Sequence, residues 1–433
     1  MSVRTWKLIF TPFVFLAGLL LSGTAFAQEQ SLEAQLDVAW RAAWTNFYSP
    51  QTNLFYDFLE SLEPGKTLDH LPNPEEVDSL YPHPCGYGTA MEDCAISGGV
   101  ILDALVDRYA NEERLGASAE ALEEIKAQAK DVFTGLELLT TVSGSPGFVA
   151  RGVSPKALGK CYINSSRDQV THLVLAVWNY WRSPLADEDA QRRAADILFA
   201  VADRMTRNVT PENDYDFLCS DGSRCRIGIS RMADVEDHEA ARLTAIYAVA
   251  WDAAKRSNDS DKEEEYWTLW RKIARDTIAQ SAHIIENPSL YNRMPPYAYL
   301  QMQESLNTLY QLEPEEELRE SIKETLKFMA ERAKARQEGA LTKLKNHDLT
   351  EIAPSWREAG GLKGPYRATW YSPRECGELA LTIAADTAND SFDDTSARVL
   401  KEALMTPDFS KITSCGLFHL LGAYEKARRL GKL

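Results

Sequence analysis

Residues 147–169, GFVARGVSPKALGKCYINSSRDQ, differ from the rest of a chain whose apolar residues mostly recur at helical spacing. The stretch has the glycines and proline of a loop, carries Arg151 and Arg167, and ends in the polar cluster NSSRDQ. The apolar run VTHLVLAVW follows at once and predicts a buried helix that begins near Asp168. A long polar loop therefore leads into the start of a buried helix, and the same plan recurs along the chain.

Helical periodicity covers most of the chain, and no pair of alternating strands flanks an Asn-Gly or Asp-Gly turn. We predict twelve helices, over residues 31–48, 92–111, 118–141, 168–181, 187–208, 234–255, 261–286, 297–312, 315–338, 375–387, 394–405 and 415–430. Long loops follow the odd-numbered helices and short turns follow the even-numbered ones. A short turn makes its two helices antiparallel neighbours.

The charge pattern divides these helices into two classes. Odd-numbered helices carry dense charge, as in KEEE at 262–265, whereas even-numbered helices are small and apolar, as in CGLFHLLGAY at 415–424. A helix without a polar face is surrounded by packing, and a helix with one covers the outside. Six inner and six outer helices predict an all-α (α/α)6 toroid that forms a single domain over residues 28–433. No repeat of fixed period favours a solenoid instead.

Composition and the first residues limit the partners and the location. The chain has 433 residues, 44% of them hydrophobic, and a formal net charge of −17, which suits a globular protein and disfavours nucleic acid as a partner. Residues 1–27 read as a signal peptide, because Arg4 and Lys7 precede an apolar core and AFA at 25–27 gives a cleavage site. No later run is apolar enough for a membrane anchor, so we expect an exported protein, periplasmic or secreted.

The seven cysteines all follow this segment, where export permits disulfides. Cys219 and Cys225 bracket the short polar loop SDGSR, and we predict a disulfide between them. Neither C-x-x-C nor H-E-x-x-H spacing occurs, and the histidines are scattered. We therefore expect no metal and no other cofactor.

Polar clusters at the starts of the even-numbered helices supply the candidate chemistry. If the inner helices of a toroid run parallel, these starts meet on one face together with the long loops. Hydrolysis of a glycosidic bond needs one carboxyl group as acid and another as base or nucleophile, and crowding raises the pKa of one of them. We expect Asp168 and Asp93 to form this pair, with Glu92 and Glu239 in support. The alternative is that these residues cap their helices by accepting from free backbone N–H groups.

A saccharide also needs flat apolar surfaces and hydrogen-bonding groups. Side chains of both kinds occur in the same loops, and the expected substrate-binding residues are Tyr87, Phe148, Arg151, Tyr162, Arg167, Gln169, His238, Trp370, Tyr371 and Glu375. The two arginines would bind a uronate or sulfate, or form salt bridges to nearby carboxylates. His172, one helical turn beyond Asp168, has the surroundings of a buried core histidine.

Three segments carry a resemblance to a known superfamily. They are GTAMED at 88–93, GFVARG at 147–152 and NSSRDQ at 164–169. These segments resemble those of uncharacterised secreted bacterial proteins of the six-hairpin glycosidase superfamily, over about residues 31–430. The resemblance implies an (α/α)6 toroid that acts on sugars, often on acidic polysaccharides. The catalytic assignment of the unsaturated-uronide hydrolases does not carry over, because their pattern is not matched.

Three functions remain open at this point. The first is an exported glycoside hydrolase that acts through a carboxylate pair on a poly- or oligosaccharide, with or without uronate. The second is a polysaccharide lyase on the same fold, with Tyr162, Tyr371 or His238 as base and Arg151 or Arg167 beside the uronate. The third is a non-catalytic protein that binds a saccharide without turning it over.

Overall fold

The computed structural model describes residues 32–225, 227–291, 294–359 and 365–433. Within these ranges the chain is almost wholly helical, and the only sheet is a short hairpin of β1 (Tyr48–Ser49) and β2 (Leu54–Phe55). The predicted all-α class is confirmed. The signal peptide predicted at 1–27 lies outside the described residues. Among the described helices, none is both long enough and apolar enough to cross a membrane.

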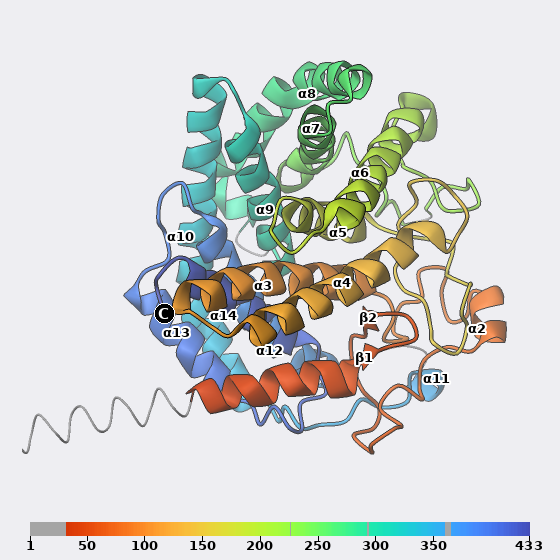
Figure 1. Cartoon of the computed structure of the whole chain (residues 1–433), viewed down its shortest axis with the longest axis vertical. Coiled ribbons are helices and arrows are strands. Elements are labelled where there is room, and N and C mark those ends of the chain that lie inside the picture. Colours follow the sequence, from red (N-terminus) through yellow and green to blue (C-terminus); the bar gives the residue numbers. More distant parts are fainter. Residues whose placement is uncertain (1–31, 226, 292–293, 360–364) are drawn as a thin grey trace, which may run out of the picture.

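Most of the long helices begin and end within a few residues of the predicted positions, but α7 begins seven residues later and α10 ends eight residues later than predicted. Figure 1 shows their arrangement. The first covers residues 32–42 and continues as a π-helical turn, Ala43–Phe47. The later long helices are α3 (Cys94–Leu115), α4 (Ala119–Thr141), α5 (Arg167–Trp181), α6 (Glu188–Asn208), α7 (Ala241–Arg256), α8 (Ser260–Glu286), α9 (Pro296–Leu312), α10 (Glu316–Asn346), α12 (Pro365–Ala385), α13 (Asp394–Met405) and α14 (Gly416–Arg429). The loops hold α2 (Pro74–Asp78), α11 (Trp356–Ala359) and a 3-10 turn, Asp237–Glu239.

Helix α12 departs most from the prediction, since it begins ten residues before the predicted start at residue 375. Pro373, two residues before the predicted start, lies inside the helix. A proline has no N–H for the carbonyl four residues earlier, here that of Thr369. The hydroxyl of Ser372 donates to this carbonyl instead, at 3.0 Å. The helix therefore continues through the proline without leaving that oxygen unpaired.

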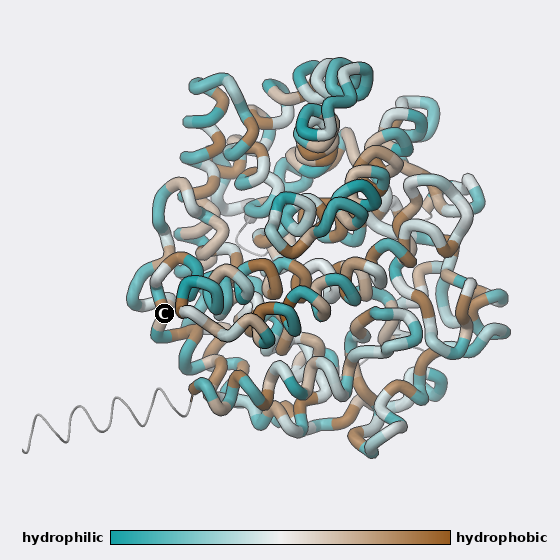
Figure 2. The backbone as a smooth tube through the Cα atoms, viewed as in Figure 1, coloured by the Kyte–Doolittle hydropathy of each residue, from teal (hydrophilic) through white to brown (hydrophobic). Residues whose placement is uncertain are grey.

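Six helices pack against one another in a continuous order. Helix α3 contacts α5, α5 contacts α7, α7 contacts α9, α9 contacts α12, α12 contacts α14, and α14 contacts α3 again. We call these six the inner helices. The helices α4, α6, α8, α10 and α13 each contact one or more of them, and we call these the outer helices. In Figure 2 much of the tube of the outer helices α8 and α10 is teal, the colour of hydrophilic residues.

The inner helices run in the same direction. Asp93, just before α3, is bonded to Gln169 in the first turn of α5, and Arg167 of α5 is bonded to Glu239 just before α7. At the other end of these helices one cavity is lined by Asp107, Asn179, Gln311, Ala385 and Lys426, which lie in the C-terminal halves of α3, α5, α9, α12 and α14. The N-terminal ends therefore gather at one end of the molecule.

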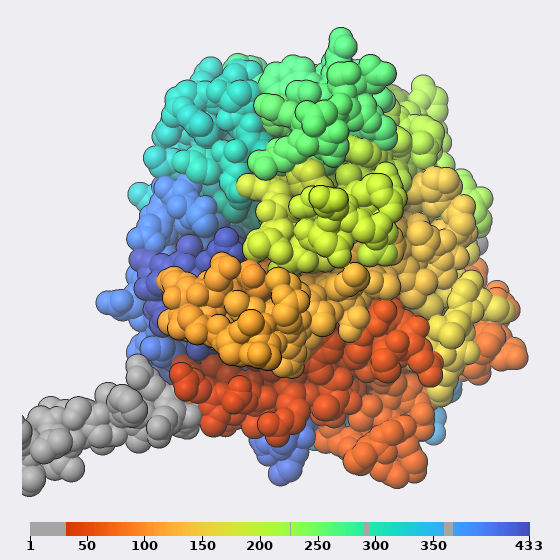
Figure 3. All heavy atoms as spheres, viewed as in Figure 1, coloured from red at the N-terminus to blue at the C-terminus, as the bar shows by residue number. Residues whose placement is uncertain are grey.

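Small residues let the inner helices approach closely. A Cβ atom on Gly377 of α12 would lie 2.4 Å from the carbonyl carbon of His419 in α14, so only glycine fits there. Around such contacts the buried apolar residues form one continuous cluster, from Leu36 to Ala427. In Figure 3 the N-terminal segment (red) covers one side of α3 and α4 (orange).

Candidate active site

Most outer helices begin differently from the inner ones, the exception being α10, which has no side-chain cap. The outer helices α4, α6, α8 and α13 are capped by side chains that accept from a backbone N–H three residues on; the caps are Ser118, Asp187, Asp259 and Asp393. No such cap is present at α3, α5, α7, α9 or α14. Asp93 occupies the N-cap position of α3 without a cap hydrogen bond, so the capping interpretation of this residue is wrong.

Asp93 is instead the centre of a network that joins three elements. Its Oδ1 accepts from Arg151 at 3.0 Å and from Gln169 at 2.8 Å, and its Oδ2 accepts from Arg374 of α12 at 2.8 Å. Burial would raise the pKa of this carboxyl group, but the guanidinium groups of Arg374 and Arg151 outweigh burial and hold the pKa below its usual value. Asp93 is therefore ionised, and it fixes the two arginines in place.

Glu92 has the opposite protonation preference. Burial and the neighbouring charge of Asp93 raise the pKa of Glu92 to about 7. The backbone N–H of Gly88 donates to its carboxyl group. Beside it, the guanidinium of Arg151 lies over the ring of Tyr87, at 4.7 Å from the ring centroid. A carboxyl group that keeps its proton up to neutral pH therefore lies next to one that is always ionised.

Asp168, in the first turn of α5, forms an ion pair across to α7. Its Oδ1 accepts from Arg242 at 2.5 Å; Arg242 is buried, whereas the Asp168 side chain is 31% exposed. Burial acts to raise the pKa of Asp168, but the charge and hydrogen bond of Arg242 lower it below the usual value. Asp168 therefore presents an ionised oxygen to solvent.

Asp168 borders a pocket of about 670 Å³ between the N-terminal ends of α5, α7 and α9. The lining includes Arg167, Asp168, His238, Glu239 and Tyr297. Arg167 donates from Nε to Glu239 at 2.6 Å and from Nη1 to the carbonyl of Gly228 at 3.2 Å. Burial lowers the pKa of His238, so its imidazole is neutral at pH 7. This space therefore lies at the gathered helix starts, beside two of the predicted catalytic residues, Asp168 and Glu239.

The aromatic residues of α12 lie beside the Asp93 network. Trp370 donates from its indole nitrogen to the carbonyl of Asp57 at 2.8 Å, and the hydroxyl of Tyr371 donates to Glu378 at 3.0 Å. Arg374 lies between these residues and donates from Nε to Glu378 at 2.7 Å. Trp370 and Tyr371 therefore support the arginine, and their polar atoms are already bonded within the protein.

Three expected substrate-binding residues lie apart from this site. Phe148 and Tyr162 are buried in the core, and the Tyr162 hydroxyl donates to the carbonyl of Tyr81 at 2.5 Å. Neither ring has a free face for a sugar. Glu375 points to the outer helix α10, where Lys343 donates to it at 3.0 Å. A carboxylate only three residues from Glu378 thus lies on the other side of α12.

The predicted Cys219–Cys225 disulfide is not formed, and all seven cysteines are free thiols. The two thiols have different neighbours, which the short loop between them did not reveal. Cys219 donates to the side-chain oxygen of Asn164 at 3.0 Å. Cys225 accepts a hydrogen bond from Cys85, and this bond lowers the pKa of Cys225 to about 5 and raises the pKa of Cys85.

Sequence reasoning missed several charged groups of the network. Arg242, Glu378 and Glu304 are single charges inside apolar helical runs, such as ARLTAIYAVAW at 241–251 and CGELALTIAA at 376–385. A lone charge in an apolar run that becomes buried needs a partner of opposite charge. This pattern could therefore have indicated that these three residues belong to a buried network. Asp57, which accepts from the backbone N–H of Asp93 at 3.0 Å, lies after the hairpin and had no such indication.

His172 is buried, as its sequence context indicated. Burial lowers its pKa to about 3, so the ring is neutral, and its Nδ1 lies 3.4 Å from a carboxyl oxygen of Glu304. Burial also raises the pKa of Glu304 well above its usual value. Among the described residues no group of three or more His, Cys, Asp or Glu could hold a metal ion.

Comparisons of the chain with protein-family models, with curated proteins and with solved structures found no match.

Proposed function

We propose that the protein is an exported glycoside hydrolase built as an (α/α)6 toroid of the six-hairpin glycosidase type. Two facts support the toroid. The contacts among the inner helices return from α14 to α3, and the helix starts gather at one end. The sequence pattern of residues 1–27 supports export, and the continuous core supports a single domain.

The observation that carries the proposal is two carboxyl groups, at the starts of the contacting inner helices α3 and α5, whose pKa values are pushed apart. The pKa of Glu92 is raised to about 7, and that of Asp168 is lowered. The side chain of Gln169 links the two segments, because its amide nitrogen donates to the backbone carbonyl of Glu92 at 3.1 Å. Hydrolysis of a glycosidic bond requires such a pair, one group that keeps a proton and one that does not.

The roles follow from these environments. Glu92 protonates the leaving oxygen, since it is the group that retains a proton near neutral pH. Asp168 acts as base or nucleophile from the edge of the pocket. Asp93, expected from sequence to be part of the pair, positions Arg151 and Arg374 instead, because three hydrogen bonds occupy its oxygens. Glu239 similarly holds Arg167.

The structure supports a lyase less well. Elimination beside a uronate needs a cation for the uronate and a base with a low pKa. Arg151 and Arg167 are both bonded to carboxylates of the protein, and burial raises the pKa of Tyr371 well above its usual value. These groups are engaged before any substrate arrives.

The test is a panel of neutral and acidic polysaccharides, assayed for new reducing ends and for the ultraviolet absorbance of an unsaturated product. We expect reducing ends without the absorbance. Asp168→Asn should lower the rate at least about a hundredfold, as the removal of one essential group does. The matched control is Asp187→Asn, the same chemical change at an outer helix, and it should retain activity. Full activity in Asp168→Asn, or no reducing ends from any polysaccharide, would overturn the proposal.

A further inference from the structure

A second pocket lies on the outside of the molecule, between α7 and α8. Three tryptophans meet there: Trp251 of α7 with Trp267 and Trp270 of α8. Trp270 is fully buried and packs α8 against α7. Trp251 is half-buried, and Trp267 is 36% exposed. Packing of the two helices accounts for Trp270, but it does not require a large apolar side chain that remains open to solvent at position 267.

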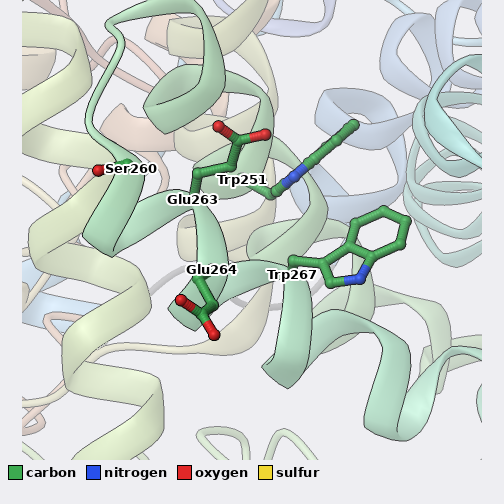
Figure 4. Close-up of a pocket in the computed structure, with 5 residues that line it drawn as sticks. All are labelled: Trp251, Ser260, Glu263, Glu264 and Trp267. Carbon is green, nitrogen blue, oxygen red and sulfur yellow. The ribbon is translucent and has the colours of Figure 1, made fainter.

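The pocket has a volume of about 380 Å³ and is lined by Trp251, Ser260, Glu263, Glu264 and Trp267. The four residues of α8 follow the spacing of one helix face. Figure 4 shows the two indole rings on one side, with Ser260 and the two carboxylates on the other. The pocket is far from the candidate active site, because Trp251 lies nine residues after Arg242, roughly 14 Å along α7.

The ring geometry selects the kind of ligand. The centroids of Trp251 and Trp267 are 5.3 Å apart, with 46° between their planes, so the rings touch and leave no room for a cation between them. The side chain of Lys255 already lies over Trp251 at 4.7 Å, and that of Arg271 over Trp267 at 5.6 Å. The pair therefore forms an apolar wall rather than a cage for an ammonium group.

The polar residues of the lining further restrict which ligand fits the pocket. Carboxylates only accept hydrogen bonds, whereas a hydroxyl both donates and accepts. Glu263 and Glu264 are the charged residues of the lining and would repel an acidic ligand beside them; Lys255 and Arg271 contact the tryptophan rings but do not line the pocket. The matching ligand has a flat apolar face and a rim of hydrogen-bond donors, which describes a pyranose ring that carries no acidic group.

We propose that this pocket is a second saccharide-binding site, specific for chains without acidic groups. The indole wall stacks on one sugar ring, and the two carboxylates accept from its hydroxyl or amino groups. The site does not depend on hydrolysis at Asp168, and binding here would remain if the proposed activity failed. In the hydrolase it would hold a polymer on the outer surface while another part of the same chain occupies the pocket beside Asp168.

The experiment is isothermal titration of the full-length Asp168→Asn protein with hexasaccharides of glucan, mannan, xylan and glucosamine, and with hexagalacturonate. We expect at least one of the four non-acidic hexasaccharides to bind and hexagalacturonate not to bind. Adding Trp267→Ala should weaken that binding at least about tenfold, as the loss of an aromatic anchor does. Ile285→Ala is the matched control, because Ile285 lies on the same helix and is also 36% exposed.

Three results would overturn this proposal: binding that Trp267→Ala leaves unchanged, tightest binding of hexagalacturonate, or no binding of any hexasaccharide. Thermal unfolding of both variants checks that they are folded. The hydrolase proposal is tested separately, by the reducing ends that the wild-type protein releases.

Discussion

Asp168 and Asp187 are the same residue type at the start of successive helices, yet their carboxylates have different kinds of partner. Asp187 accepts from the backbone N–H of Ala190 at 2.8 Å and caps the outer helix α6. Asp168 caps nothing and is bonded to Arg242 of the next inner helix. The comparison teaches that an exposed aspartate at a helix start serves as a cap even with a lysine nearby, as Asp187 does beside Lys130, whereas a partly buried one pairs with a buried arginine.

Exposure explains the difference. The side chain of Asp187 is 58% exposed, that of Asp168 31%, and that of Asp93 14%. A carboxylate that loses water must replace it with strong donors, and one backbone N–H is not enough. At the inner helix starts buried arginines supply those donors, whereas the cations beside the outer caps Asp187 and Asp393 are the lysines Lys130 and Lys334.

The largest expected effect comes from removing a buried cation of the inner starts. Arg374→Ala leaves Asp93 and Glu378 without their shared partner, and both carboxyl groups are buried or nearly so. Breaking a buried pair in this way costs about 3–5 kcal/mol of unfolding free energy. Urea denaturation measures the change. The control is Arg398→Ala in the outer helix α13, where the ion pairs are exposed and the loss should be much smaller. Equal losses in the two variants would remove the distinction between inner and outer charges.

The next effect concerns pH, because the two kinds of inner carboxyl group respond oppositely. Glu92 has its pKa raised from 4.5 to about 7, so its contribution to stability is full below pH 4.5 and is lost as the pH rises through about 7. Asp168 has a lowered pKa, so its contribution is full above pH 3.8 and is lost as the pH falls through the lowered value.

Glu92→Gln tests this assignment. Wild-type kcat/KM should fall as the pH rises through about 7, since the acid loses its proton there. The variant should lose most of its activity, and its unfolding free energy should decline less steeply between pH 4.5 and about 7, because Glu304 and other buried carboxyl groups with raised pKa values remain. Glu188→Gln, in the first turn of the outer helix α6, should leave both profiles as they are. A wild-type activity that stays level from pH 5 to about 9 would exclude Glu92 as the acid.

The sequence predicted the helices well and the site only in part. Apolar periodicity located most helix ends, because burial of one face is a local property of the chain. The start of α12 was misplaced because the Ser372 hydroxyl compensates for Pro373, which periodicity does not register. Asp168 and Arg167 were predicted from a polar cluster. Their partners Arg242 and Glu239 lie on the next inner helix and its preceding turn, and such pairings depend on how distant segments pack.

The cysteines also show that the sequence does not reveal which distant segments pack together. Cys219 and Cys225 are close in sequence, which suggested a bond between them, but the partner of Cys225 is Cys85, on the loop before α3. Proximity along the chain is a weak guide wherever long loops fold over the same end of the molecule. Phe148 and Tyr162 failed as sugar platforms for a related reason, since a loop that covers a core turns its aromatic side chains inward.

The smallest expected effect is at the caps themselves. Asp187→Ala removes the acceptor for Ala190 and should lower the unfolding free energy by about 1 kcal/mol, with hydrolysis unchanged. Asp168→Ala should lower both, because Arg242 then keeps a buried charge without its partner. Urea denaturation and reducing-end release, measured on both variants, show whether each aspartate acts as a helix cap or as part of the carboxylate site. If Asp187→Ala reduced hydrolysis as much as Asp168→Ala does, helix stability rather than a carboxylate site would explain why aspartates stand at these helix starts.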